Sequence, residues 1–182
     1  MNERRDQDQH PSFPLTEFTA SPLPAPSTQM DPKGKAYSEF ALFALHSAHG
    51  RYEEAERHLE RAIEQDPEAV FLLQRMALLL KQQGKNEDAL TYARRCVELE
   101  PTRIEHHLLE AEIAGLLERE EEAIQAYKKA LVLDPDHKRA RLVLTTLLIK
   151  TKRYDQALRQ LDRIIEQDPN LVIAHYYRGR VY

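Results

Sequence analysis

Residues 50–67 read GRYEEAERHLERAIEQDP, and residues 84–101 read GKNEDALTYARRCVELEP. Both stretches open on a glycine, carry an alanine five residues later and close on an acidic residue followed by proline. The same frame continues along the chain at a constant step of 34 residues. It is marked by the alanines Ala55, Ala89, Ala123 and Ala157 and by the prolines Pro67, Pro101, Pro135 and Pro169. A fixed period of this length indicates an array of structural repeats.

Each repeat predicts two amphipathic helices joined by a tight turn. In the first repeat, apolar residues recur at helical spacing over residues 36–49, and Gly50 marks the turn. The second helix ends before Pro67, since proline cannot continue a helix. Its predicted inward face consists of Tyr52, Ala55, Leu59, Ala62 and Ile63. The conserved step of the alanines has a physical reason, because two helices pack closely only over small side chains. Cys96 takes the slot of Ala62 and is expected to be a small core residue.

The period divides the chain into a leader, residues 1–34, and a repeat domain, residues 35–182. The expected units are 36–69, 70–103, 104–137 and 138–171, followed by a partial unit at 172–182. The leader holds six of the ten prolines, mixed with serine and threonine, and is predicted to be disordered. Its apolar residues leave a second hypothesis open, in which a short leader segment docks on the chain's own groove or on a partner. These apolar residues are Phe13, Leu15, Phe18 and Leu23.

The period, the turn glycine, the tyrosine two residues later and the closing Asp-Pro resemble the tetratricopeptide repeat. The match is clearest at residues 50–55 and 153–157 and extends over residues 36–182. The resemblance implies an all-α fold, a right-handed solenoid of antiparallel helix pairs with four complete repeats and one helix of a fifth. The third repeat departs from the pattern. Glu118 and Glu120 replace its turn glycine and tyrosine, and Glu110 stands at a usually apolar slot.

The resemblance also implies that the first helices line a concave groove, where this family usually binds an extended peptide or a partner helix. The groove residues carried over by position are Tyr37, Phe40, Phe71, Gln74, Leu78, Lys81, Glu105, Leu108, Glu112, Arg139, Leu142, Thr146, Lys150, Tyr176 and Arg180, with Ala44 and Ile173 beside them. Aromatic side chains mixed with both signs of charge suit peptide recognition. The alternative is that several of these residues only pack against neighbouring helices. Phe40 and Ala44 stand where chaperone-binding members carry a lysine and an asparagine, which argues against binding of chaperone tails.

Composition excludes several other classes of function. The 182 residues carry a formal net charge of −4, so the chain lacks the basic excess of a nucleic-acid binder. The single cysteine forms no internal disulfide. No secretory signal and no apolar run of about 18 residues is visible, which makes the cytoplasm the default location and predicts no membrane-spanning segment.

Motifs of catalysis and of cofactor or metal binding are also missing from the sequence. It has no nucleotide-binding loop, nucleophile elbow or HExxH motif. The pairs His46–His49 and His106–Glu110 have helical spacing but lack a third ligand. We therefore expect no enzymatic activity, no cofactor and no metal.

The primary hypothesis is a protein-protein interaction scaffold that binds a protein or peptide ligand in its groove. An alternative is a regulatory or substrate-recruiting arm of a larger enzyme, or of an envelope assembly complex, that continues beyond Tyr182. The last predicted helix presents Ile173, Tyr176 and Tyr177 without a partner helix. This predicts either a fragment of a longer array or self-association through that helix.

Overall fold

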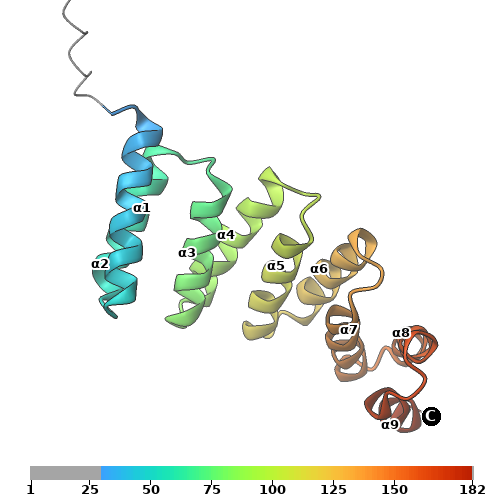
Figure 1. Ribbon diagram of the computed structural model, residues 1–182. Coiled ribbons are helices and arrows are strands. Elements are labelled where there is room, and N and C mark those ends of the chain that lie inside the picture. The colour runs from blue at the N-terminus through green and yellow to red at the C-terminus, as the bar shows by residue number, and fades with distance from the viewer. Residues whose placement is uncertain (1–29, 182) are drawn as a thin grey trace, which may run out of the picture. The chain divides into compact units, whose positions relative to one another are not determined.

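The computed structural model describes residues 30–181, so the prediction for residues 1–29 of the leader lies outside the described residues. Within the described part the chain is entirely helical (Figure 1). The helices are α1 (Pro32–Ala48), α2 (Tyr52–Gln65), α3 (Val70–Gln82), α4 (Asn86–Leu99), α5 (Ile104–Leu116), α6 (Glu120–Leu133), α7 (Lys138–Lys150), α8 (Tyr154–Gln167) and α9 (Val172–Val181). Each odd-numbered helix up to α7 pairs with the next helix along the chain, as the period predicts. The all-α repeat fold is thereby confirmed.

The first helix corrects the predicted boundary of the leader. Helix α1 begins at Pro32, so residues 32–34, which were assigned to the leader, are helical. Proline is well suited to the first helical position, where its missing N–H would have no intrahelical partner. Asp31 caps this helix, because its side-chain oxygen accepts a hydrogen bond of 2.7 Å from the backbone N–H of Gly34.

The alanines that mark the period are fully buried. Ala55, Ala89, Ala123 and Ala157 each have 0% exposure, as expected for the contact between the paired helices. Cys96 is also completely buried, and burial raises the pKa of its thiol to about 11. These observations confirm the prediction of a small core residue at that slot, because a thiol with such a pKa forms little thiolate at neutral pH.

The turns between paired helices share one backbone geometry even where the sequence departs from glycine. The residue after the first helix has a positive φ at Gly50, Gly84, Glu118 and Lys152, with values of 70°, 76°, 56° and 58°. In each turn the next residue donates a backbone hydrogen bond to the carbonyl five residues earlier, as Arg119 does to Ala114 at 3.0 Å. This is the Schellman arrangement that closes a helix C-terminus. The third repeat therefore turns as the others do.

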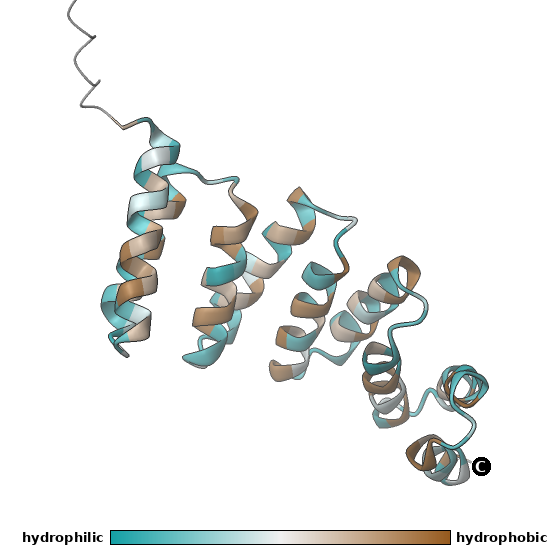
Figure 2. Cartoon of the chain, viewed as in Figure 1, coloured by the Kyte–Doolittle hydropathy of each residue, from teal (hydrophilic) through white to brown (hydrophobic). Residues whose placement is uncertain are grey.

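Two expectations about inward faces are wrong at the edges of the helices. Tyr52 and Tyr154 were expected to face inward, but they are 54% and 44% exposed. Both are the first residue of a helix, so no preceding turn of their own helix covers the ring. Apolar residues are denser along α3 and α5 than along α2 and α8, which are amphipathic with one polar face (Figure 2).

A second periodic contact closes the turns between repeats. His107 Nε2 lies 2.8 Å from the carbonyl of Pro101, and His175 Nε2 lies 2.8 Å from that of Pro169. At the same slot of the repeat between them, the guanidinium of Arg141 donates to the carbonyl of Pro135. A polar side chain six residues after the proline thus holds the turn, and this explains part of the burial of Arg141.

Candidate functional site

A cavity of about 670 Å³ opens between α3, α5, α6 and α7. Its walls come mainly from the first helices of the third and fourth repeats. Four of the predicted groove residues line it together, namely Lys81, Leu108, Glu112 and Arg139. The register carried along the repeats therefore brings residues from three first helices to one cavity.

The remaining lining is mostly apolar. It consists of Ala111, Gly115, Leu116, Tyr127, His137, Ala140, Val143 and Leu147. Leu116 is 56% exposed, whereas Tyr127 is only 5% exposed. Burial, aided by the nearby Glu112 carboxylate, raises the pKa of Tyr127 to about 12, so its hydroxyl keeps its proton at neutral pH. The cavity can therefore accept an apolar side chain against a largely uncharged wall.

The charges at the cavity are not all compensated within the described part of the chain. Lys81 Nζ lies 3.1 Å from Glu112 Oε2, which neutralises one pair across α3 and α5. His137 Nδ1 accepts a hydrogen bond of 3.1 Å from the backbone N–H of Ala140 and so caps α7. Among residues 30–181, exposed Arg139 makes no hydrogen bond or ion pair. One cation is thus left to interact with a ligand.

An aromatic cluster (Tyr37, Phe40, Phe43 and Phe71) joins α1 to α3. The rings of Tyr37 and Phe71 stack with their centroids 6.0 Å apart, and Phe40 meets Phe71 edge-on at 5.3 Å. Tyr37 is 61% exposed and Phe71 is 38% exposed, so apolar surface remains accessible there. Three predicted groove residues are therefore in mutual contact, at a different place from the cavity.

Other predicted groove residues have structural contacts. Leu142 packs against the buried cluster of Leu161, Ile164 and Ala174, and half-buried Leu78 packs against the core of the first repeats. Lys150 Nζ lies 2.8 Å from Glu120 Oε1.

The last four predicted groove residues line neither the cavity nor the aromatic cluster. The guanidinium of Arg180 lies 5.8 Å from the ring centre of Tyr176. The Thr146 hydroxyl donates to the Leu142 carbonyl, Gln74 is half-buried, and Glu105 is exposed.

Sequence reasoning missed several residues that line the cavity. Gly115 stands 34 residues after Lys81, so the repeat register alone could have found it. Val143 and Leu147 lie on a face of α7 whose counterparts in α5, Leu109 and Ile113, are buried. No signal in the sequence separates these two pairs, because the difference depends on how α7 is placed against α5.

The histidines that were considered as metal ligands have other contacts. The rings of His46 and His58 stack with their centroids 4.9 Å apart, and His58 Nδ1 lies 2.7 Å from Glu39. Burial lowers the pKa of His46, helped by the positive charge of Arg51. Across the described residues, no three histidine, cysteine or carboxylate side chains converge as metal ligands would. No helix in that part of the chain has the length and apolar character needed to cross a membrane.

The sequence profile of the tetratricopeptide repeat family matches residues 47–113 and 117–177. This chain belongs to the tetratricopeptide repeat family. The human Tetratricopeptide repeat protein 13 is 30% identical over 151 residues, which cover 79% of this chain and 17% of that protein. The chain therefore spans about a sixth of the length of this relative.

Solved structures show the same fold. A crystal structure of MamA superposes with a TM-score of 0.72 at 19% identity and covers 81% of each chain. The crystal structure of YrrB, described as a tetratricopeptide repeat protein with an unusual peptide-binding site, superposes with a TM-score of 0.69 at 20% identity. It covers 81% of this chain and 76% of YrrB.

Proposed function

We propose that this tetratricopeptide repeat chain is a protein-interaction scaffold that binds a peptide segment in the cavity between α5 and α7. The peptide inserts an apolar side chain between Leu108 and Val143 and places a carboxylate near Arg139. The observation that carries the proposal is a cavity of about 670 Å³ with an apolar lining and one uncompensated cation. Family membership and the peptide-binding description of YrrB support the same class of function.

The chemistry of the groove favours an internal peptide segment over a free C-terminal tail. The slots that hold a lysine and an asparagine in chaperone-binding members carry no such pair in any of the four complete repeats. They hold Phe40 and Ala44, Gln74 and Leu78, Leu108 and Glu112, and Leu142 and Thr146. Without that pair, binding energy comes from the buried apolar anchor, with Arg139 adding specificity for a neighbouring acid.

Selection from a displayed library of random peptides tests this function. We expect enrichment of peptides with an apolar residue close to an acidic one. Gly115→Leu should weaken binding of a selected peptide by tenfold or more, which corresponds to about 1.4 kcal/mol. A Cβ at Gly115 meets no atom within 4 Å, so the larger side chain enters the cavity without displacing the fold.

Two further variants sharpen the test. Gly179→Leu is the matched control, because Gly179 is also helical with open space around it but does not line the cavity. It should bind the peptide as the unmodified chain does. Arg139→Glu should weaken acidic peptides and spare neutral ones. Failure to enrich any peptide, or equal binding by the Gly115→Leu and Gly179→Leu variants, would show that the cavity is not the binding site.

A further inference from the structure

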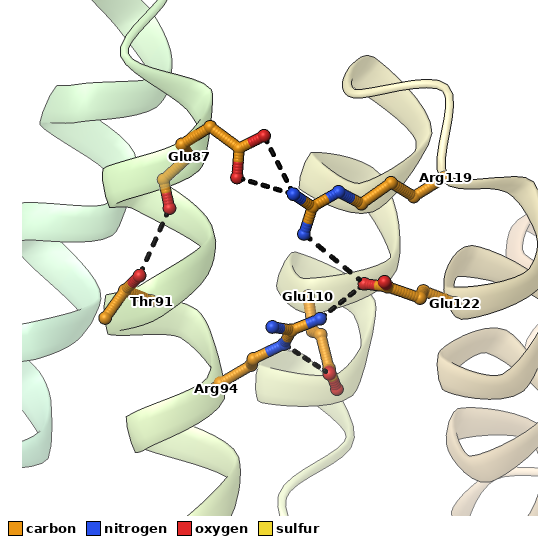
Figure 3. A network of polar contacts seen from close by, with 6 residues as sticks. All are labelled: Glu87, Thr91, Arg94, Glu110, Arg119 and Glu122. Carbon is orange, nitrogen blue, oxygen red and sulfur yellow. Dashed lines mark hydrogen bonds and ion pairs between the residues drawn. The ribbon is translucent and has the colours of Figure 1, made fainter.

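The packing of α4, α5 and α6 holds a network in which each arginine meets a carboxylate (Figure 3). Arg94 Nε lies 3.7 Å from Glu110, and its terminal nitrogen pairs with Glu122. Arg119 is 2.8 Å from Glu87 and 3.8 Å from Glu122. The positive charges at this junction between the second and third repeats are therefore neutralised by the chain itself.

The next junction, where α6, α7 and α8 meet, has lost these acids. Each of its residues can be compared with the one 34 positions earlier. The carboxylates Glu98, Glu110 and Glu122 become Val132, Leu144 and Gln156. The carboxylates that would neutralise cations at this junction are thus replaced by two apolar residues and one neutral amide.

Positive charge increases at the same junction. Arg94 and Lys129 are followed by Lys128 and Arg163, which keep their charge. His107 and Gln125 are followed by Arg141 and Arg159, which add two cations. Four positive side chains therefore stand where the preceding junction has two, and they meet none of the three acids.

The four cations line one cavity of about 420 Å³. No carboxylate lines it, and the other walls come from Leu131, Val132, Leu144, Gln156 and Gln160. Lys128 donates to the side-chain oxygen of Gln156 at 3.1 Å, which is a neutral acceptor. Arg159 and Arg163 make no hydrogen bond or ion pair within the described part of the chain. Their guanidinium groups remain available to a ligand.

Arg141 makes the charge imbalance costly. Its side chain is 4% exposed, and its contacts are with neutral oxygens, including Gln160 at 2.8 Å. Its Nε has no hydrogen-bond partner. Burial lowers the pKa of this guanidinium, and repulsion from Arg163 lowers it further. A buried cation without a carboxylate gains from any anion that approaches it.

Carboxylates do occur on the other side of the arginines. Arg141, Arg159 and Arg163 also border a cavity of about 440 Å³ that contains Asp136, Asp162 and Glu166. Asp136 accepts a hydrogen bond of 2.6 Å from Gln167, and Asp162 lies 3.7 Å from Arg178. None of these acids forms an ion pair with the three arginines, so the cavity on the α6 side keeps its positive character.

We propose that the cavity between α6, α7 and α8 binds an oxyanion, a phosphate or carboxylate group, carried by a molecule whose apolar part rests on Leu131, Val132 and Leu144. Guanidinium groups form short, paired hydrogen bonds to such groups. Val132 is 79% exposed at the rim and offers apolar surface next to the charged site. This oxyanion site is separate from the peptide cavity, with which it shares no lining residue.

Titration of the full chain with inorganic phosphate, at constant ionic strength against chloride, tests the site by NMR of the arginine Nε–H signals. We expect saturable shifts at Arg159 and Arg163 and none at Arg94 and Arg119, which already have carboxylate partners. A parallel titration with acetate distinguishes a carboxylate ligand from a phosphate ligand. Equal shifts of all four arginines would indicate unspecific screening and would overturn the proposal, as would no shift with either anion.

A reciprocal exchange between the two junctions makes the test specific. Gln156→Glu restores the carboxylate that Glu122 provides one repeat earlier, and should abolish the response to the anion while raising the thermal midpoint in its absence. Glu122→Gln removes the upstream carboxylate and should create a phosphate response at Arg94. Arg159→Ala should also abolish the response without altering Arg94. A response that persists in both Gln156→Glu and Arg159→Ala would contradict the site.

Discussion

At the turns between paired helices, single residues hold a backbone conformation that most side chains avoid. Gly50 and Gly84 adopt positive φ at no steric cost, whereas Glu118 and Lys152 adopt it with side chains present. A left-handed residue other than glycine costs about 1–2 kcal/mol. The two later turns keep the geometry because the Schellman hydrogen bonds and the packed helices on either side hold it.

Two glycine substitutions should have opposite effects on stability. Gly84→Ala places a Cβ on a residue with φ of 76° and should lower the free energy of unfolding by about 1 kcal/mol. Gly115→Ala lies inside α5 with open space around it and should raise that free energy by about 0.5–1 kcal/mol. Urea unfolding followed by circular dichroism measures both. A loss of stability in both variants would show that local packing, and not backbone conformation, decides the sign.

At the scale of the helices, the start of α1 depends on a cap that the other first helices mostly lack. Asp31 accepts from the N–H of Gly34, whereas Ala69 and Arg103 provide no side-chain cap to α3 and α5. Helix α1 also buries only Ala36, so packing contributes less to it than to α3. A helix with few buried residues relies more on its end groups.

We therefore expect Asp31→Ala to destabilise α1 by about 1 kcal/mol. Asp31→Asn keeps an oxygen acceptor and is the matched control, with a change close to zero. Hydrogen exchange of the Gly34 amide reports the cap directly, and urea unfolding reports the global effect. If the alanine and asparagine variants exchange at the same rate, the 2.7 Å hydrogen bond does not support the helix.

The sequence predicts the helices more completely than the site, and the reason is physical. Proline, turn glycine and small alanine act locally, so the bounds of a helix such as α4 follow from its own residues. The lining of a cavity depends instead on how neighbouring helices tilt. Leu108 and Leu142 occupy the same slot 34 residues apart, yet Leu108 lines the cavity and Leu142 packs against the α8–α9 core.

At the scale of the whole array, residues 31–182 bury their apolar side chains in successive clusters. One cluster extends from Ala36 to Ala123, a second from Ala111 to Ala157, and a third holds Leu161, Ile164 and Ala174. Stability in such an array is close to a sum of contributions from each repeat and its nearest neighbours. The third cluster is the smallest, and α9 buries only Ala174.

Hydrogen exchange should therefore be fastest in α9 and slowest in α3 and α4, and a local change should stay local. Ile164→Ala removes a side chain that is 3% exposed in the third cluster, and such a truncation costs about 2–5 kcal/mol. Because α3 and α4 share no cluster with Ile164, we expect faster exchange in α8 and α9 and unchanged rates in α3 and α4. Leu72→Ala is the matched control and should accelerate exchange in the first repeats. Equal acceleration along the whole chain by Ile164→Ala would show that the array unfolds as one unit, and the nearest-neighbour description would then fail.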